Sequence, residues 1–220
     1  MTLIALVPMK GHSARVPGKN LRPLAGRPLF EWIVEALLGT IGVDRVVVDT
    51  DSDEIAQRVA AAFPEVEVHD RPEHLRGDFI PMHDIVAHLA SALEGDVFLQ
   101  THATNPLLTS GTIGRAIEVH AGPGSHDSLM SVTPRRSRFY FEDGSPVNHD
   151  PLVLGRTQDL PPLFEENSNL YVAARDVILA SRRRIGANPV LFPIGPEEAW
   201  DIDEELDFFI AETLLARRTP

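Results

Sequence analysis

Short apolar runs alternate with amphipathic stretches along most of this 220-residue chain. The runs that have the character of buried strands are residues 3–7, 46–48, 66–68, 96–100 and 128–132. Helical periodicity between them predicts helices over residues 29–38, 54–63, 82–93 and 110–120. Strands that alternate with helices in this way are joined by right-handed crossovers. The sequence therefore predicts a Rossmann-like α/β fold, with a mainly parallel sheet covered by helices on both faces.

The alternation is interrupted between residues 134 and 169. Asp143-Gly144 predicts a hairpin within this segment, and three arginines and three aromatic residues precede it. We interpret 134–169 as an excursion from the sheet of a single domain, 1–220, with its aromatic residues serving packing or a dimer surface.

The remaining segments return to the alternating pattern. The predicted elements are strands at 170–173 and 190–194, a helix at 176–182 and a last amphipathic helix at 204–215. The apolar spacing in that last helix predicts an inward face formed by Leu206, Phe209, Ile210 and Leu214.

The loop after the first strand reverses the sign of the surrounding charge. The chain has a net charge of −12, yet five basic residues and no acidic residue occur between residues 8 and 30. Lys10 and Lys19 are the only lysines of the chain, and a flexible ammonium group suits phosphate oxygens. Gly11 and its neighbouring glycines let backbone amides approach an anion. We predict a triphosphate-binding loop; the alternative is a solvent-exposed basic loop.

Composition limits the possible partners and chemistry. With 43% hydrophobic and 24% charged residues, the chain is typical of a globular protein, and its acidity argues against binding nucleic acid or an anionic membrane. No apolar stretch is as long as a membrane span or a signal peptide, so we expect a cytoplasmic protein. The absence of cysteine excludes disulfides, thiolate catalysis and thiolate-bound metals.

Two acidic groups are candidates for a magnesium site. Asp49, Asp51 and Asp53 follow a predicted strand, and Asp201 and Asp203 precede the last helix. Mg²⁺ usually takes one or two protein carboxylates, so either group suffices. For Asp53 we favour a helix N-cap, whereas capping by Asp203 and metal binding by the pair remain equally open from spacing alone.

Six stretches, in this order, resemble the acylneuraminate cytidylyltransferase family, the CMP-sialic acid synthetases and their relatives. They are VPMKGHSARVPGKNLRPLAGRPLFEW, VVVDTDSDEIA, RPEHLRGD, LQTHATNPL, RTQDLPPLFEENSNLYV and WDIDEELDFFIAE. The resemblance implies a nucleotide-binding α/β fold whose excursion forms a homodimer. It also implies an enzyme that uses CTP and Mg²⁺, transfers CMP to a sugar-acid acceptor and releases pyrophosphate.

The resemblance also implies roles for individual residues. The nucleotide-binding positions would be Lys10, Gly11, Ser13, Arg15, Lys19, Asn20, Arg71 and Asp78, with Lys10, Arg15 and Lys19 acting in catalysis. Gln100 and Asn167 would approach the acceptor sugar, and Asp201 and Asp203 would bind the metal. Cations and Mg²⁺ placed in this way would stabilise the charge that develops on the leaving pyrophosphate.

The sequence departs from the family pattern at two places. Lys10 and Arg15 exchange the cation types that the family commonly has in this loop. Glu165 stands where the family usually has a basic residue, and Ser168-Asn169 replaces Gly-Ala. A carboxylate beside an anionic acceptor would repel it. Sialic, legionaminic, pseudaminic and deoxyoctulosonic acids and a phosphonate therefore all remain candidate acceptors.

Two rival functions fit parts of the pattern. A nucleotide-sugar glycosyltransferase uses Asp-x-Asp metal ligands, which Asp49-Thr50-Asp51 or Asp201-Ile202-Asp203 could supply, but a sugar donor needs no triphosphate loop. A CTP-binding homologue without turnover is the second rival, suggested by the altered loop and by Glu165.

Overall fold

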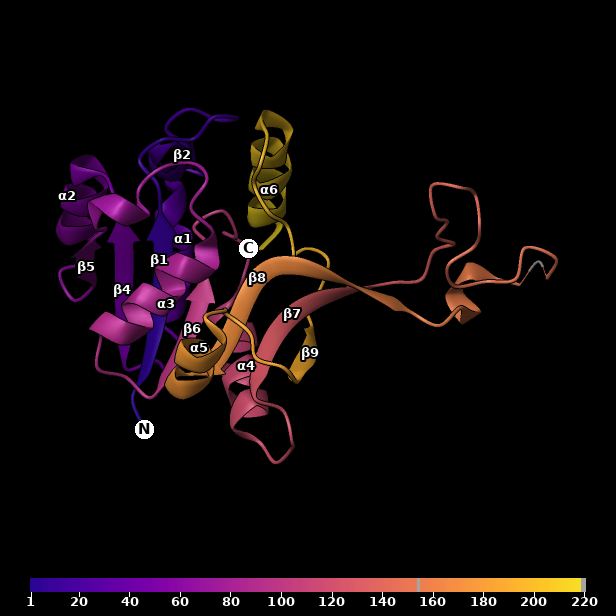
Figure 1. Ribbon diagram of the computed structural model, residues 1–220. Helices are drawn as coiled ribbons and strands as arrows, with labels where there is room; N and C mark the ends of the chain where they lie inside the picture. The colour runs from indigo at the N-terminus through magenta and orange to yellow at the C-terminus, as the bar shows by residue number, and fades with distance from the viewer. Residues whose placement is uncertain (154, 219–220) are drawn as a thin grey trace.

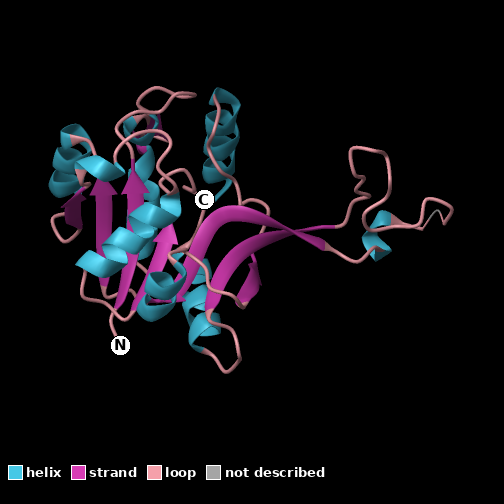
Figure 2. Ribbon diagram, viewed as in Figure 1, coloured by secondary structure: helices cyan, strands magenta, loops and turns pink. Residues whose placement is uncertain are grey.

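The computed structural model describes residues 1–153 and 155–218, and it places a seven-stranded sheet at the centre of the chain (Figures 1 and 2). The strands run in the order β5-β4-β1-β6-β8-β7-β9. Their bounds are β1 Leu3–Met9, β4 Arg45–Thr50, β5 Glu67–Asp70, β6 Val97–Thr101, β7 Ser128–Arg135, β8 Leu163–Ala174 and β9 Pro189–Pro193. The pairs β5-β4, β4-β1, β1-β6 and β7-β9 are parallel, and β8 runs antiparallel to both of its neighbours. The predicted Rossmann-like α/β architecture is confirmed.

Helices cover both faces of this sheet. The helices are α1 Leu29–Leu38, α2 Asp53–Ala62, α3 Met82–Ala92, α4 Ser110–Ala121, α5 Arg175–Ser181 and α6 Glu205–Arg218. Short 3-10 turns occupy Lys19–Leu21, Glu73–Leu75 and Thr157–Asp159, and β2 Pro23–Leu24 pairs with β3 Arg27–Pro28 as a small hairpin. No helix within the described ranges is both long and apolar enough to cross a membrane.

Strand β1 is buried along its whole length because its two faces belong to two different cores. Val7 packs with residues of α1, α2 and α4 on one side of the sheet. Ile4 and Leu6 pack with residues of α3 and α5 on the other side. This explains why β1 has a continuous apolar sequence instead of an alternating one.

Helix α6 docks through a different stripe from the one predicted. Phe208, Ala211 and Leu215 are buried, whereas Leu206 and Phe209 are 64% and 68% exposed. The predicted inward face was therefore wrong for Leu206 and Phe209; Leu214 does pack against the same core, from its edge. Apolar residues occur on two adjacent stripes of this helix, so periodicity alone leaves its rotation undetermined. The rotation is fixed by tertiary contacts, among them the guanidinium of Arg22, which lies 4.3 Å above the ring of Phe208.

The excursion leaves the sheet as a two-stranded ribbon that extends far from helices α1 to α6 (Figure 2). Pairing between β7 and β8 continues to Arg135 and Leu163, so the part outside the ladder is 136–162, shorter than the predicted 134–169. The two strands take in the two ends of the predicted excursion, because they prolong their hydrogen bonds beyond the sheet. Leu154, which belongs to the predicted excursion, lies outside the described residues. The predicted hairpin at Asp143-Gly144 is confirmed by an antiparallel bridge between Tyr140 and Pro146.

Candidate active site

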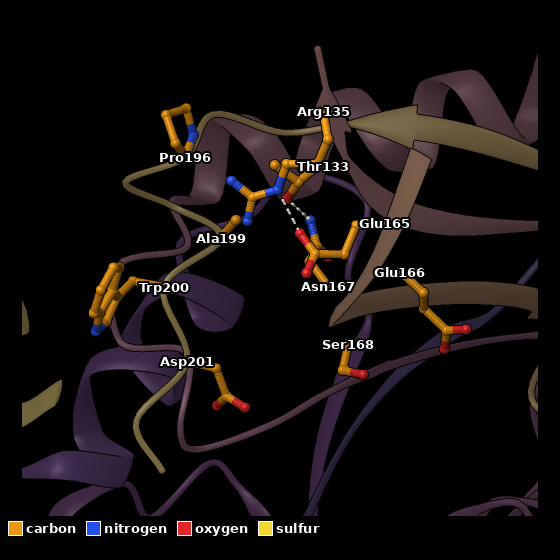
Figure 3. Close-up of a pocket in the computed structure, with 10 residues that line it drawn as sticks. All are labelled: Thr133, Arg135, Glu165, Glu166, Asn167, Ser168, Pro196, Ala199, Trp200 and Asp201. Carbon is orange, nitrogen blue, oxygen red and sulfur yellow. Dashed lines mark hydrogen bonds and ion pairs between the residues drawn. The ribbon is translucent and has the colours of Figure 1, made fainter. Parts of the chain in front are cut away.

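Two neighbouring cavities lie at the edge of the sheet where β1 and β6 end. The loop cavity, of about 390 Å³, is formed by the segment after β1, the segment after β6 and part of the loop before α3. The ribbon cavity, of about 350 Å³, lies between the base of the β7-β8 ribbon and residues 196–201 (Figure 3). The threonine Thr104 of the loop cavity hydrogen-bonds the carboxylate of Asp201 in the ribbon cavity, so the two cavities adjoin.

The loop cavity gathers most of the residues predicted to bind the nucleotide. Those that line it are Lys10, Ser13, Arg15, Lys19, Asn20 and Asp78. Asn20 shapes the loop by donating from Nδ2 to the carbonyl oxygen of Lys10 at 2.9 Å. Gly11 lies behind the lining, where its amide donates to Asp51 Oδ1 at 2.7 Å. A Cβ at Gly11 would come within 2.7 Å of the Ser52 Cβ, so the close approach of the two backbones requires glycine.

Each of the three loop cations has an acidic or carbonyl partner. Lys10 Nζ lies 3.7 Å from Asp78 Oδ1, and Arg15 Nη2 donates to Asp203 Oδ1 at 2.6 Å. Lys19, whose side chain is 12% exposed, donates to the carbonyl oxygen of Ile202 at 2.7 Å and lies 3.5 Å from Asp203. The cations are thus held in fixed positions around the cavity, where oxygens of a phosphate chain could replace the carboxylates.

His102 also lines the loop cavity, although the sequence predicted no role for it. Burial, together with the charges of Arg184 and Lys19, lowers the pKa of His102 to about 4. The imidazole is therefore neutral at physiological pH, and its Nε2 lies 2.9 Å from Nε2 of Gln100. The signal available was its position immediately after a strand, at the edge where α/β folds bind ligands.

Gln100 and Arg71 are buried and line neither cavity. Gln100 donates to the carbonyl oxygen of Thr101 at 2.9 Å, beneath the loop cavity and apart from Asn167, its predicted companion at the acceptor. Arg71 donates from Nε to Asp49 Oδ2 at 2.6 Å and from Nη2 to the carbonyl oxygen of Met9 at 3.1 Å. Arg71 thus supports the end of β1 from below.

The acidic group after β4 has structural partners. Asp49 accepts the hydrogen bond from Arg71, and its Oδ1 lies 3.0 Å from Nδ1 of His69. Ser52 caps α2 by accepting from the amide of Ile55, so the N-cap is Ser52, and Asp53 is the first helical residue. With Asp49 enclosed and Asp51 holding Gly11, these carboxylates fit a structural role better than a metal site.

Asp201 and Asp203 lie on opposite sides of the boundary between the two cavities. Asp201 lines the ribbon cavity, whereas Asp203 accepts from Arg15 at the loop cavity. Ile202 between them is fully buried, and its amide donates to the carbonyl oxygen of Thr104 at 2.9 Å. The amide of Asp203 is bound by Asp207 Oδ2 at 2.8 Å. The Asp203 carboxylate therefore faces the loop cations and does not cap α6.

The surroundings of Asp201 suit a divalent cation. Burial raises the pKa of Asp201, as do the carboxylates of Asp203 and Asp207, against the lowering effects of Thr104 and Lys19. Nearby Asn105 has a buried Oδ1 with no hydrogen-bond partner in the described part of the chain, while its Nδ2 lies 3.4 Å from Asp201. No cluster of three or more metal-binding side chains occurs among the described residues, but Mg²⁺ commonly takes only one or two carboxylates plus water and phosphate oxygens.

The ribbon cavity has a polar wall built from facing residues of β7 and β8 (Figure 3). Asn167, predicted to contact the acceptor, donates from Nδ2 to Thr133 Oγ1 at 3.1 Å and accepts from Ser131 at 2.6 Å. Arg135 donates from Nε to Glu165 Oε2 at 2.6 Å. Sequence reasoning missed Arg135, because nothing in its local sequence distinguishes it from the arginines that follow it.

Comparisons with known proteins agree with this geometry. Residues 4–196 match a family described as Cytidylyltransferase. N-acylneuraminate cytidylyltransferase A of Danio rerio is 30% identical over 222 residues, which cover 97% of this chain and 50% of that protein. The chain thus spans about half the length of that relative. CMP-N,N'-diacetyllegionaminic acid synthase of Legionella pneumophila is 29% identical over 231 residues, covering 98% of this chain and 97% of that protein.

A solved structure supports the fold independently of close sequence similarity. It is that of CMP:2-keto-3-deoxy-manno-octonic acid synthetase complexed with CTP, which superposes with a TM-score of 0.75 at 17% identity and covers 99% of this chain and 100% of that chain.

Proposed function

Because the chain belongs to the cytidylyltransferase family, we propose that it transfers CMP from CTP to a nonulosonic, sialic-acid-like sugar acid and releases pyrophosphate. The observation that carries this proposal is the position of Asp201 and Asp203 between two adjoining cavities. One cavity offers cations for a triphosphate, and the other offers a polar wall for a second substrate.

In this proposal the loop cavity binds CTP. Lys10, Arg15 and Lys19 contact phosphate oxygens, with Ser13 and Asn20 as neutral partners. As the bond to the α-phosphorus breaks, negative charge grows on the pyrophosphate, and cations that are already in position stabilise it without reorganising. Arg71 contributes indirectly by holding the end of β1.

The acceptor lies in the ribbon cavity beside Asn167, and its hydroxyl attacks the α-phosphorus in line. Asn167 is well oriented for this because Ser131 and Thr133 fix its amide. Gln100 lines neither cavity, so we propose that it acts indirectly, by orienting His102 through the contact between their side chains. No side chain near the hydroxyl is assigned as general base.

Asp201 and Asp203 are the residues that would hold Mg²⁺, with the free Oδ1 of Asn105 close by. A magnesium ion bound there would neutralise charge on phosphate oxygens. Asp203 must then exchange its bonds to Arg15 and Lys19, which becomes possible when those two cations bind the triphosphate.

We also propose that the protein is a homodimer and that it acts in the cytoplasm, where CTP is available. The arm formed by 136–162 supports the first point, because it carries exposed apolar side chains that include Tyr140, Phe141 and Leu152. Such side chains on a thin ribbon are best covered by a second subunit.

The deciding experiment measures pyrophosphate release with CTP and Mg²⁺ across a panel of sialic, legionaminic, pseudaminic and deoxyoctulosonic acids and simple phosphonates. Acceptor-dependent release with a sugar acid supports the proposal. Release of a nucleoside diphosphate from a nucleotide sugar would support a glycosyltransferase instead. CTP binding without any release would identify a homologue that has lost turnover.

A further inference from the structure

The lining of the ribbon cavity carries more negative than positive charge. Among the described residues that form it, Arg135 is the single cation, whereas Glu165, Glu166 and Asp201 are carboxylates. This balance is unexpected for a cavity that, under the proposed function, receives an anionic sugar acid.

Two of the carboxylates have different partners. Glu166 accepts from Arg184 Nη2 at 2.9 Å and from the hydroxyl of Tyr171, and Arg184 does not line the cavity. The charge of Glu166 is therefore balanced by Arg184, a cation outside the cavity lining. Among the described residues, Glu165 forms an ion pair only with Arg135, the same cation that the cavity offers to a ligand.

The pairing of Arg135 with Glu165 follows from the strand register. Thr133 lies opposite Glu165 on β8, so Arg135, two residues further along β7, projects from the same face as a diagonal neighbour. The two side chains are 51% and 53% exposed, and Figure 3 shows the guanidinium and the carboxylate meeting at the cavity wall. Both groups are therefore accessible to a ligand.

This inference rests on the proposed function, in which the cavity receives a sugar acid. The carboxylate of that acceptor and the carboxylate of Glu165 then compete for Arg135. A sugar-acid carboxylate that binds Arg135 displaces Glu165 and leaves its negative charge unpaired beside the anionic ligand. Like charges that lie close together repel each other, so this arrangement is unfavourable. A ligand that also brings a cation removes the conflict, since each protein charge then keeps an opposite partner.

We infer that the ribbon cavity selects a sugar acid that also carries a positively charged nitrogen substituent, with the acceptor carboxylate bound by Arg135 and the cationic substituent bound by Glu165. The chemical class is thus a zwitterionic acceptor, for example an amidine, in place of the neutral N-acyl form.

The test compares two acceptors of nearly equal shape. One is N,N'-diacetyllegionaminic acid, and the other is the same acid with one acetamido group replaced by acetamidino, prepared separately at each nitrogen. Dissociation constants are measured by calorimetry with a CTP analogue that has a methylene bridge between the α- and β-phosphorus, so that binding is read without turnover. Pyrophosphate release with CTP gives kcat/KM for the same pair.

For the wild-type protein we expect one amidino acceptor to bind about fivefold or more tightly than the diacetyl acid at low salt. Glu165→Gln should bring that ratio to about one and should improve binding of the diacetyl acid, because Arg135 is released. The control is Glu67→Gln, which removes a matched cross-strand partner of Arg45 at the opposite end of the sheet and should leave the ratio unchanged.

The outcomes separate the inference from the proposed function. A wild-type ratio near one at both nitrogens, no measurable binding of either amidino acceptor, or a ratio unchanged by Glu165→Gln would overturn the inference, even if pyrophosphate is released with the diacetyl acid. Absence of pyrophosphate release with any acceptor, together with a ratio that depends on Glu165, would overturn the proposed function and support the inferred charge preference.

Discussion

Nη2 of Arg15 donates a hydrogen bond of 2.6 Å to Oδ1 of Asp203, across 188 residues of sequence. This contact joins the basic loop after β1 to the acidic segment before α6. Phosphate oxygens that bind Arg15 would compete with Asp203 for the guanidinium and free the carboxylate. Binding of the triphosphate and exposure of the proposed metal ligand are therefore coupled in this geometry.

Replacing Lys19 by alanine should lower kcat for pyrophosphate release by about 100-fold or more, since it removes a fixed cation from the leaving group. The fold should persist, because Lys19 lies at the margin of the core and its main contact is one carbonyl oxygen. The readouts are steady-state pyrophosphate release and circular dichroism. Arg58→Ala, on the exposed face of α2, is the matched control and should retain activity. A Lys19→Ala enzyme with normal turnover would refute the assignment of this loop.

Asp201→Asn should abolish most turnover and yet raise the midpoint of thermal unfolding of the metal-free protein at about pH 7. The pKa of Asp201 is raised in the folded state, chiefly by burial, so folding favours its protonated form. The protonated Asp201 carboxyl stabilises the folded state fully at pH values below the pKa that it has in the unfolded chain. This stabilisation is lost as the pH rises through the higher pKa of the folded state. At neutral pH the ionised carboxylate opposes folding, whereas asparagine does not.

Thermal unfolding measured with and without Mg²⁺ checks this prediction. Added Mg²⁺ should stabilise the wild type, because it compensates the ionised carboxylate, and should stabilise Asp201→Asn much less. Equal stabilisation of both proteins would place the metal elsewhere.

The sequence was sufficient for the parts of the fold in which local pattern and tertiary structure agree. β1 is a continuous apolar run because both of its faces are buried. The helix predicted after β4 is present as α2, although its N-cap is Ser52 and not the favoured Asp53. The rotation of α6 could not be predicted, since Phe208 and Phe209 are both apolar and only the docked surface distinguishes them.

The candidate site divides in a similar way. That Lys10 and Lys19 line one cavity was predictable from their position after a strand, whereas their phosphate-binding role stays a prediction. The ion pair of Arg135 with Glu165 depends on the register of two strands separated by a long excursion. Register over such a distance is set by the complete ladder and is not readable from either strand alone.

Asp49→Asn should destabilise the protein by about 3 kcal/mol, because it leaves the buried guanidinium of Arg71 with only the more distant carboxylate of Asp51, 3.9 Å away. Arg71 and Asp49 are each 1% exposed, so water cannot replace the lost charge. Urea unfolding followed by fluorescence measures the change. The control is Asp70→Asn, where an exposed carboxylate paired with Arg76 should contribute less than about 1 kcal/mol. Similar losses in the two variants would mean that the buried pair has no special role.

Ser168→Gly should stabilise the protein by about 1 kcal/mol, which corresponds to roughly 2–4 °C in the unfolding midpoint. Ser168 has φ of 56°, a left-handed conformation that glycine adopts without steric conflict. The conformation is imposed by its place in β8, between Asn167, which binds Thr133, and Asn169, which binds the carbonyl oxygen of Ala199. Greater freedom of the unfolded glycine chain opposes part of this gain.

Ser168→Ala distinguishes the backbone effect from loss of the hydroxyl group, because alanine keeps the strain and removes only a weak 3.4 Å contact with Tyr171. We therefore expect Ser168→Ala to unfold within about 0.5 kcal/mol of the wild type, with Ser168→Gly above both. If Ser168→Gly were instead the less stable of the two variants, the hydroxyl-independent strain at this position would be negligible. The hydrogen bonds next to Asn167 would then hold the backbone without conformational cost. Serine at position 168 would carry no stability penalty relative to glycine.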